Sequence, residues 1–187
     1  MTQASQHTAP SAADIVARFE CSEAAQAQLA SADTPIALLD KLERATLWLD
    51  ALRLAAYTCT KREAVWWACL CIENAKIPSN EAQQRALQIA QRWVDTQDES
   101  ERRLAFTASE AAGLNHAAGC AALAAFWSGG SMAPPDAPVV PPDDHLCHHA
   151  AACSSILAGA AQPERAAAHY REFIALAKDV MTGKRTW

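Results

Sequence analysis

One uncharged run near the middle of the chain most constrains its fold. Nine consecutive residues, 64–72, carry no charge and include two adjacent tryptophans. No regular secondary structure can give such a run one clean polar face, so we expect it to be buried. Thr60 and Glu63 stand before it at the spacing of a capping box, which favours a helix over a buried strand. We therefore predict a central helix over 61–75.

Helical spacing and turn residues predict further helices on both sides of the central one. Alanine supplies much of the 51% hydrophobic content and aromatic residues only 6%, which favours closely packed helices over a sheet. Thr34 before Pro35 is a typical helix start, and the apolar spacing after it predicts one long helix over 35–57. The remaining predicted helices are two weak ones at 14–18 and 22–30, one at 81–95, two within 99–127, one that Asp143 or Asp144 caps and that ends near 159, and one from Pro163 to 181.

The predicted fold is therefore all-α, a compact helical bundle of antiparallel helix hairpins. Residues 128–142 hold five of the nine prolines, and we predict that they form a stiff, irregular crossover between two helices. A chain of 187 residues fits one domain, which we place at 11–182. A mobile tail at 1–10 and a short C-terminal tail at 183–187 flank it in this prediction.

A faint internal duplication leaves a second arrangement open. A cysteine, an aliphatic residue three positions later, a proline turn and an amphipathic helix follow one another twice, beginning at Cys69 and at Cys153. Chance similarity between alanine-rich hairpins explains this order, and so does an old hairpin repeat packed in a HEAT-like arrangement.

Six large apolar side chains are assigned to the core because they lie on the apolar faces of predicted helices. Adjacent helical residues point about 100° apart, so the two neighbouring tryptophans can both be buried only if elements pack on two sides. The predicted core residues are Trp66, Trp67, Leu70, Ile72, Trp93 and Phe173.

Charge and cysteine content exclude several classes of protein. The net charge of −5 argues against a nucleic-acid partner, although it leaves room for a small local basic patch. The first ten residues lack the basic start and apolar run of a secretory signal, and no apolar stretch reaches the length of a membrane span. Seven cysteines without a disulfide-framework spacing indicate reduced thiols. We expect a cytoplasmic protein with no membrane partner.

No catalytic motif and no cofactor motif is present, so we predict a protein that is not an enzyme, with no catalytic residues and no cofactor. The strongest alternative is a metal site in the segment 145–153, where His145, His149 and Cys153 would lie along one helix stripe. Three ligands spread over two turns span too far for one ion without help from elsewhere. The plainer interpretation is a helix start with polar histidines near solvent.

Partner-binding candidates lie beside the crossover and at the C-terminus. An aromatic residue next to prolines, or on an exposed tail, is a common anchor in protein interfaces, although ordinary packing is the alternative. The candidates are Trp127, Met132, Pro134, Pro135 and Trp187.

Two strings, REAVWWAC at 62–69 and FWSGGSMAPP at 126–135, carry a resemblance to a known family. The chain resembles, over roughly 35–180, a family of short helical bacterial proteins of unassigned function that is associated with gene neighbourhoods of type VI secretion spikes and effectors. The resemblance implies an accessory role, in which an adaptor or co-chaperone helps to load an effector or spike protein. It brings no catalytic residues with it.

We therefore expect a non-enzymatic protein-binding accessory whose partner is an effector, adaptor or spike protein. Two alternatives stay open: an immunity protein that neutralises a toxin, and a metal-dependent or thiol-dependent enzyme that uses the segment 145–153. The sequence leaves the oligomeric state open.

Overall fold

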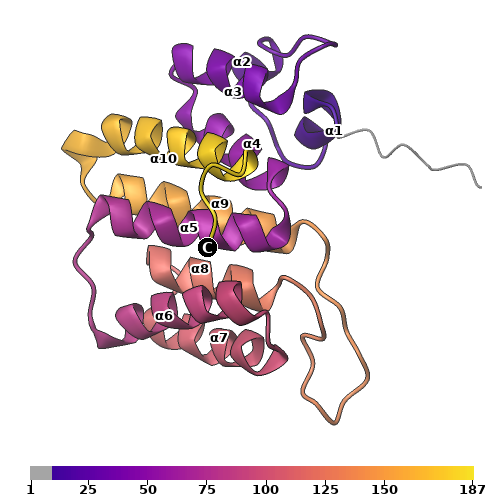
Figure 1. The fold of residues 1–187 in the computed structure, drawn as a ribbon, viewed down its shortest axis with the longest axis vertical. Helices are drawn as coiled ribbons and strands as arrows, with labels where there is room; N and C mark the ends of the chain where they lie inside the picture. The colour runs from indigo at the N-terminus through magenta and orange to yellow at the C-terminus, as the bar shows by residue number, and fades with distance from the viewer. Residues whose placement is uncertain (1–9) are drawn as a thin grey trace, which may run out of the picture.

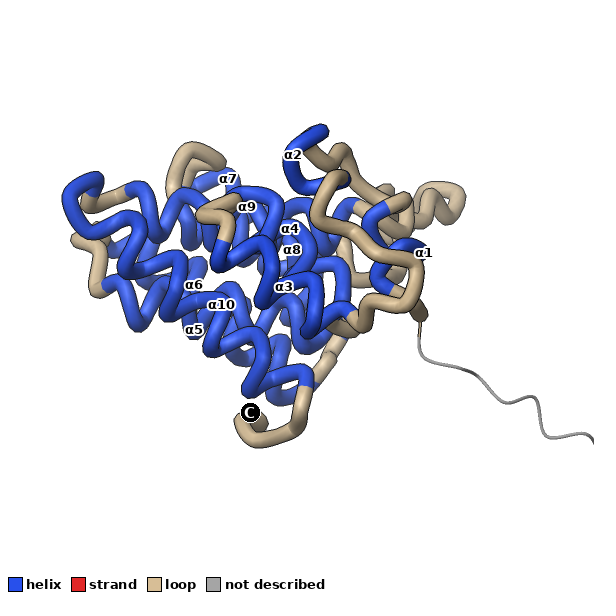
Figure 2. The backbone as a smooth tube through the Cα atoms, turned by 90° about the horizontal axis from the view of Figure 1, so that it is seen from above, coloured by secondary structure: helices blue, strands red, loops and turns tan. Residues whose placement is uncertain are grey.

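Ten α-helices and one short 3-10 helix make up residues 10–187, the part of the chain that the computed structural model describes (Figure 1). Between these residues no strand occurs, which confirms the all-α helical bundle (Figure 2). The helices are α1 (Ala12–Val16), α2 (Glu23–Gln26), α3 (Pro35–Arg44), α4 (Trp48–Thr58), α5 (Lys61–Ala75), α6 (Glu81–Thr96), α7 (Glu99–Ala112), α8 (Ala117–Phe126), α9 (Leu146–Ala160) and α10 (Ala166–Met181), with the 3-10 helix η1 (Pro163–Arg165) before α10. Except for Pro10, the tail predicted at 1–10 lies outside the described residues.

The helices stack along the long axis of the molecule, with α1, α2 and α3 at one end and α6 and α7 at the other (Figure 1). Helices α5 and α9 pack against each other in the middle. Helices α8 and α6 cover one side of this pair, with α7 packed on their outer side, and α4 and α10 cover the other side. None of the helices in the described residues is long and apolar enough to cross a membrane.

The central helices α5 and α9 run parallel. Lys61 at the start of α5 forms an ion pair of 3.2 Å with Asp144, just before α9. At the other end, the Gln162 side chain, just after α9, donates a hydrogen bond of 3.2 Å to the carbonyl of Ala75. The two segments of the faint duplication therefore lie in adjacent parallel helices, and their hairpin partners α6 and α10 lie on opposite sides.

The sequence predicted the limits of α5 correctly. The Thr60 hydroxyl accepts a hydrogen bond from the Glu63 amide at 3.3 Å, and the Glu63 carboxylate accepts one from the Thr60 amide at 2.8 Å. This is the predicted capping box. The helix ends at Ala75 because Lys76 takes a left-handed conformation, with φ of 49°, ahead of the turn that contains Pro78.

The two adjacent tryptophans of α5 differ in burial, and Trp66 packs against the edge of the core rather than inside it. Trp67 is fully buried and its indole N–H donates to the Phe173 carbonyl at 2.9 Å. Trp66 is only partly buried, because it points about 100° away and the packed helices cover that direction incompletely. The other assigned residues, Leu70, Ile72, Trp93 and Phe173, are buried.

The single long helix predicted over 35–57 is wrong, since a break separates α3 from α4. Thr46 adopts a left-handed conformation with φ of 55°. The amide of Leu47 bonds to the Leu42 carbonyl at 2.9 Å and that of Thr46 to the Glu43 carbonyl at 3.0 Å, the pattern of a Schellman motif. A β-branched residue rarely takes this conformation, so nothing in the sequence around Thr46 indicates a helix end.

The start of α9 differs from the prediction as well. Neither Asp143 nor Asp144 caps the helix, whose N-cap position is His145 and whose first residue is Leu146. The Asp143 carboxylate instead contacts Nδ1 of the His145 ring at 2.7 Å. The aspartate therefore orients an imidazole rather than the first turn of the helix.

Candidate functional site

The crossover loop, residues 128–142, extends away from the stacked helices between α8 and α9 (Figure 1). It is irregular, as predicted, and its two ends are joined by hydrogen bonds. The amide of Met132 donates to the Val140 carbonyl at 2.8 Å. The Ser131 hydroxyl accepts from the amides of Ala133 and Val140, both at 3.1 Å. These bonds close the base of the loop and leave 133–139 as its tip.

A buried arginine of α7 fixes the base of this loop. Arg102 is only 3% exposed, and its guanidinium donates to the Phe126 carbonyl at 2.6 Å and to the Ser131 carbonyl at 2.9 Å. The Glu99 carboxylate accepts from Nε of Arg102 at 2.6 Å and balances its charge. Gly130, with φ of 64°, lets the backbone pass the guanidinium, because a Cβ there would lie 2.7 Å from Nη2.

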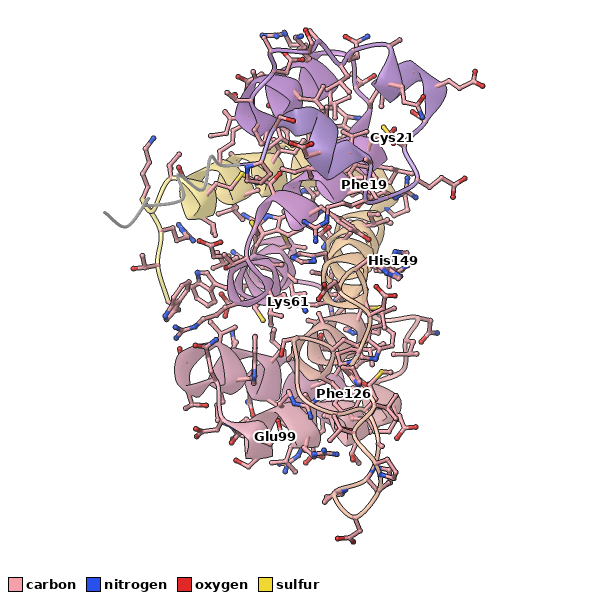
Figure 3. The ribbon with its side chains drawn as sticks, turned by 90° about the vertical axis from the view of Figure 1, so that its right-hand side faces the viewer. Phe19, Cys21, Lys61, Glu99, Phe126 and His149 are labelled. Atoms are coloured by element: carbon pink, nitrogen blue, oxygen red, sulfur yellow. The ribbon has the colours of Figure 1, made fainter. Side chains whose placement is uncertain are left out.

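The next residue, Arg103, adds a third attachment. Its Nη1 donates to the Ala133 carbonyl at 2.7 Å and its Nε to the Glu99 carboxylate at 2.9 Å. Hydrogen bonds from Arg102, and then from Arg103, lower the pKa of Glu99. Figure 3 shows Glu99 and Phe126 near the base of the loop. Two consecutive arginines therefore hold three carbonyls of one segment, around a carboxylate that stays ionised at neutral pH.

The tip of the crossover loop presents apolar side chains to solvent. Pro134 and Pro135 are exposed, and Met132 is exposed at its base, as expected of partner-binding candidates. Sequence reasoning missed Val139 and Val140, which are 77% and 47% exposed. Their signal was available, because two consecutive β-branched residues between prolines cannot both turn inward in an extended segment.

An apolar groove between α8 and α9 lies beside the start of this loop. Its volume is about 370 Å³, and Trp127, partly buried, forms part of its wall. Leu114 is 54% exposed in the same lining. We refer to it as the α8–α9 groove, and the residues that line it are Leu114, Cys120, Leu123, Trp127, His149, Ala150, Cys153, Ile156 and Leu157.

The three residues of the metal hypothesis do not converge on one point. His149 Nε2 lies 3.6 Å from the Cys153 sulfur, whereas His145 pairs with Asp143. Among residues 10–187, no group of three or more His, Cys, Asp and Glu side chains has the geometry to hold a metal ion. Desolvation raises the pKa of the Cys153 thiol, so this cysteine is a protonated thiol at neutral pH.

The cysteines behave as small apolar side chains. None of the seven forms a disulfide bond, and burial raises the pKa of Cys120 to about 11 and that of Cys147 to about 12. Cys69 and Cys71 are both fully buried in α5. No thiol of this set has the depressed pKa that a nucleophile needs.

The last partner-binding candidate, Trp187, packs on its own chain. Its ring lies 4.0 Å from the guanidinium carbon of Arg62, although the residue is still 44% exposed. Arg62 donates from Nε to the Val94 carbonyl at 2.6 Å and from Nη2 to the Asp95 carbonyl at 3.1 Å. The tail therefore closes over the contact between the start of α5 and the end of α6.

Comparison with known proteins gives one match. A family model with the description "Family of unknown function (DUF6931)" matches residues 38–181. No curated protein and no solved structure matches the chain. The match covers nearly the same residues as the resemblance drawn from the two sequence strings, and it confirms a family of unassigned function.

Proposed function

The chain belongs to the DUF6931 family of unknown function, and we propose that it is a non-enzymatic protein-binding accessory. The observation that carries this proposal is the rigid attachment of an exposed apolar loop. Arg102 and Arg103 hold two carbonyls of the loop and the Phe126 carbonyl at the end of α8, while the loop tip stays apolar and open to solvent. A loop that is already ordered loses little conformational entropy on binding, so more of its contact energy appears as affinity.

The α8–α9 groove extends this apolar surface. Trp127 ends α8, lines the groove and precedes the crossover loop in the chain, so it joins the two parts. Partner interfaces combine apolar anchors with pockets that receive the partner's own anchors. The loop tip supplies the first feature and the groove supplies the second.

The finer part of the proposal is a role as adaptor or co-chaperone for a type VI secretion effector or spike protein in the cytoplasm. Its support is the resemblance carried by the strings at 62–69 and 126–135. An immunity protein that neutralises a toxin would use the same kind of surface. The second role differs in its consequence for the cell, because an immunity protein protects against its partner and a chaperone delivers it.

The chemistry of the segment 145–153 favours binding over catalysis. A nucleophilic cysteine requires a thiolate at neutral pH, usually next to a positive charge. Desolvation moves the pKa of Cys153 in the opposite direction, although His149 Nε2 lies within hydrogen-bond distance of its sulfur.

The test uses charge reversal of the apolar surface. The protein is co-expressed with each effector, adaptor and spike protein encoded beside it, and affinities of the recovered complexes are measured by calorimetry. Val139→Arg at the loop tip and Leu114→Arg at the groove should each weaken binding at least tenfold, because each buries an unpaired charge in the interface. Leu49→Arg is the matched control, since Leu49 is a 45% exposed leucine on α4, beyond the central helices.

Equal affinities for the three variants would refute the proposed surface, and the absence of any complex with these neighbours would refute the secretion role. Thermal unfolding of each variant checks that the fold is intact. Rescue of cells from a neighbouring toxin by the wild-type protein, lost in Val139→Arg, would assign the immunity role.

A further inference from the structure

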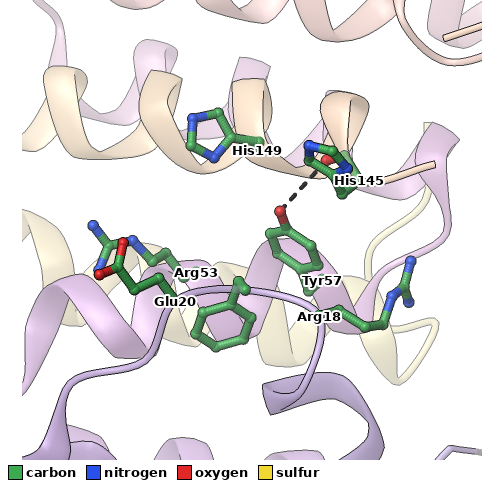
Figure 4. Close-up of a pocket in the computed structure, with 7 residues that line it drawn as sticks. Arg18, Glu20, Arg53, Tyr57, His145 and His149 are labelled. Atoms are coloured by element: carbon green, nitrogen blue, oxygen red, sulfur yellow. Dashed lines mark hydrogen bonds between the residues drawn. The ribbon is translucent and has the colours of Figure 1, made fainter. Parts of the chain in front are cut away.

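A second cavity, separate from the crossover loop, lies between the connection of α1 to α2, the end of α4 and the start of α9 (Figure 4). Its volume is about 250 Å³. We propose that this cavity, the cationic pocket, binds the phosphate group of a phosphate monoester. Its lining residues are Arg18, Phe19, Glu20, Arg53, Tyr57, His145 and His149. The proposal does not depend on the proposed function.

The lining contains donors that suit a phosphate group, although Arg18 and Arg53 lie at opposite ends of the cavity (Figure 4). Two guanidinium groups, two imidazoles and one phenol come from three segments that are distant in the sequence. Guanidinium groups bind phosphate through paired N–H donors, and a tetrahedral dianion accepts more such bonds than a planar carboxylate. The chain as a whole carries a charge of −5, so this gathering of basic groups runs against the general composition.

The guanidinium of Arg53 keeps most of its donors for a ligand. Its nearest carboxylate, Asp50, is 3.9 Å from Nη1, beyond hydrogen-bond length. The two oxygens of that carboxylate instead accept from the amide of Ser22 at 3.1 Å and from the Ser22 hydroxyl at 2.8 Å. Asp50 therefore fixes the start of α2 and pairs with Arg53 only at 3.9 Å, so the guanidinium of Arg53 keeps hydrogen-bond donors for a ligand.

Arg18 is held by an aromatic contact rather than by an ion pair. Its guanidinium carbon lies 5.7 Å from the centre of the Tyr57 ring. In the part of the chain that the structure describes, no ion pair joins Arg18 to a carboxylate within 4.0 Å. Phe19 and Tyr57 lie with ring centres 5.1 Å apart, and they give the cavity an aromatic surface for the organic part of an ester.

One nitrogen of each imidazole and the phenol hydroxyl remain for a ligand, and Nε2 of His145 donates to it when that ring is protonated. Asp143 occupies Nδ1 of His145 at 2.7 Å, which leaves Nε2 of that ring. His149 contacts Cys153 through Nε2, which leaves Nδ1. The Tyr57 hydroxyl reaches the His145 carbonyl at 3.5 Å, a long bond that a phosphate oxygen can replace.

Glu20 is the one carboxylate in the lining, and it provides a test with the opposite sign. Its charge opposes that of the two arginines and repels an anionic ligand. Glu20→Gln should therefore tighten phosphate binding several-fold. A gain in affinity is a stringent outcome, because damage to the fold cannot produce it.

The experiment measures binding of inorganic phosphate to the full chain by calorimetry, with the ring signals of His145 and His149 followed by NMR. Arg53→Gln should weaken binding about tenfold or more, because it removes charge-assisted hydrogen bonds, and Arg18→Gln should weaken it by less, because Arg18 lies at the other end of the cavity (Figure 4). Arg171→Gln is the matched control and should bind like the wild type. Its guanidinium also lies 5.7 Å from an aromatic ring, that of Trp48, and it does not line the pocket.

Two further probes identify the source of the phosphate. The affinities of inorganic phosphate, phenyl phosphate and a phosphoserine peptide are compared. If phenyl phosphate binds most tightly, the ligand is a small ester. If the peptide binds most tightly, the ligand is a phosphorylated protein partner. The proposal is overturned if phosphate gives no saturable change in the two histidine signals. It is also overturned if the Arg53 and Arg171 variants bind alike, or if benzoate binds as tightly as phenyl phosphate.

Discussion

The crossover loop and the C-terminal tail, residues 183–187, are both irregular segments with aromatic or apolar side chains, and an arginine holds each of them. The loop is held through its backbone, because Arg102 donates to the Ser131 carbonyl and Arg103 to the Ala133 carbonyl. Trp187 in the tail is held through its side chain, which lies on the face of Arg62. Hydrogen bonds to carbonyls fix the course of a main chain, whereas stacking holds one ring.

This difference separates two candidates that the sequence presented as equivalent. The crossover loop keeps its shape while its apolar tip faces solvent, which suits recognition of a partner. The ring of Trp187 packs against the guanidinium of Arg62. The N–H donors of that arginine bind the carbonyls of Val94 and Asp95 and not the backbone of the tail. We therefore propose the crossover loop, and not the tail, as the partner-binding segment.

Replacing the arginine that holds each segment by alanine should give the largest difference in unfolding free energy between the crossover loop and the tail. Arg102→Ala removes a buried guanidinium and leaves the Phe126 carbonyl without its donor, so it should cost about 3 kcal/mol of unfolding free energy. Arg62→Ala should cost about 1 kcal/mol, since its partners lie at the more accessible end of α6. Urea unfolding measures both values, and equal losses would show that the loop is not held by Arg102.

Two glycines with nearly the same backbone conformation make a sharper comparison. Gly130 in the loop has φ of 64° and Gly183 in the tail has φ of 68°. Gly183→Ala should cost about 1 kcal/mol, the usual penalty for a left-handed alanine. Gly130→Ala should cost about 2 kcal/mol, because its new Cβ also meets the guanidinium of Arg102. Urea unfolding of the two variants gives the difference, and a difference of zero would mean that Arg102 moves aside freely.

Acid should weaken the loop attachment and spare the tail. The folded-state pKa of Glu99 lies below the ordinary carboxyl value of 4.5, so its contribution to stability is present above about pH 4.5 and is lost as the pH falls through the folded-state value. The contribution should be under about 1 kcal/mol, because solvent screens this half-exposed carboxylate. Arg62 bonds only to carbonyls and a ring, so its contact does not involve a carboxylate that can be protonated.

Unfolding midpoints of the wild type and Glu99→Gln measure this effect between pH 7 and pH 3. The wild type should be the more stable protein at neutral pH, and the two should converge at the acid end. A gap that stays constant over this range would contradict the role of the Glu99 charge.

The sequence predicted those parts of the fold that local chemistry decides. The capping box at Thr60 and the proline at 78 set both ends of α5 correctly, because each acts on its own neighbours. The helix break at Thr46 could not be predicted from the sequence. The packing of α3 against α4 imposes a conformation there that a threonine does not favour by itself. Likewise, the burial of Trp67 but not of Trp66 depends on which helices lie beside α5.

The candidate site was predicted in part, for the same reason. Prolines and an adjacent tryptophan mark the crossover loop in the sequence itself. The residues that fix it, Arg102 and Arg103, lie 24 and 30 positions from carbonyls that they hold, a separation with no sequence signature. The cationic pocket joins three distant segments, and the sequence analysis did not predict it.

Truncation of the tail aromatic should have the smallest effect. Trp187→Ala removes a cation–π contact at a 44% exposed ring, so it should lower the unfolding free energy by about 0.5 kcal/mol. A double-mutant cycle with Arg62→Ala should return a coupling of about the same size, because the two side chains share this contact.

The informative result is the combination of this stability measurement with a measurement of partner binding. Trp187→Ala could leave stability unchanged but lower partner affinity as much as Val139→Arg does. In that case the tail is an anchor, and Trp187 stacks on Arg62 only when no partner is bound. If stability falls slightly and affinity stays the same, Trp187 contributes to packing alone, and the difference between the two segments holds.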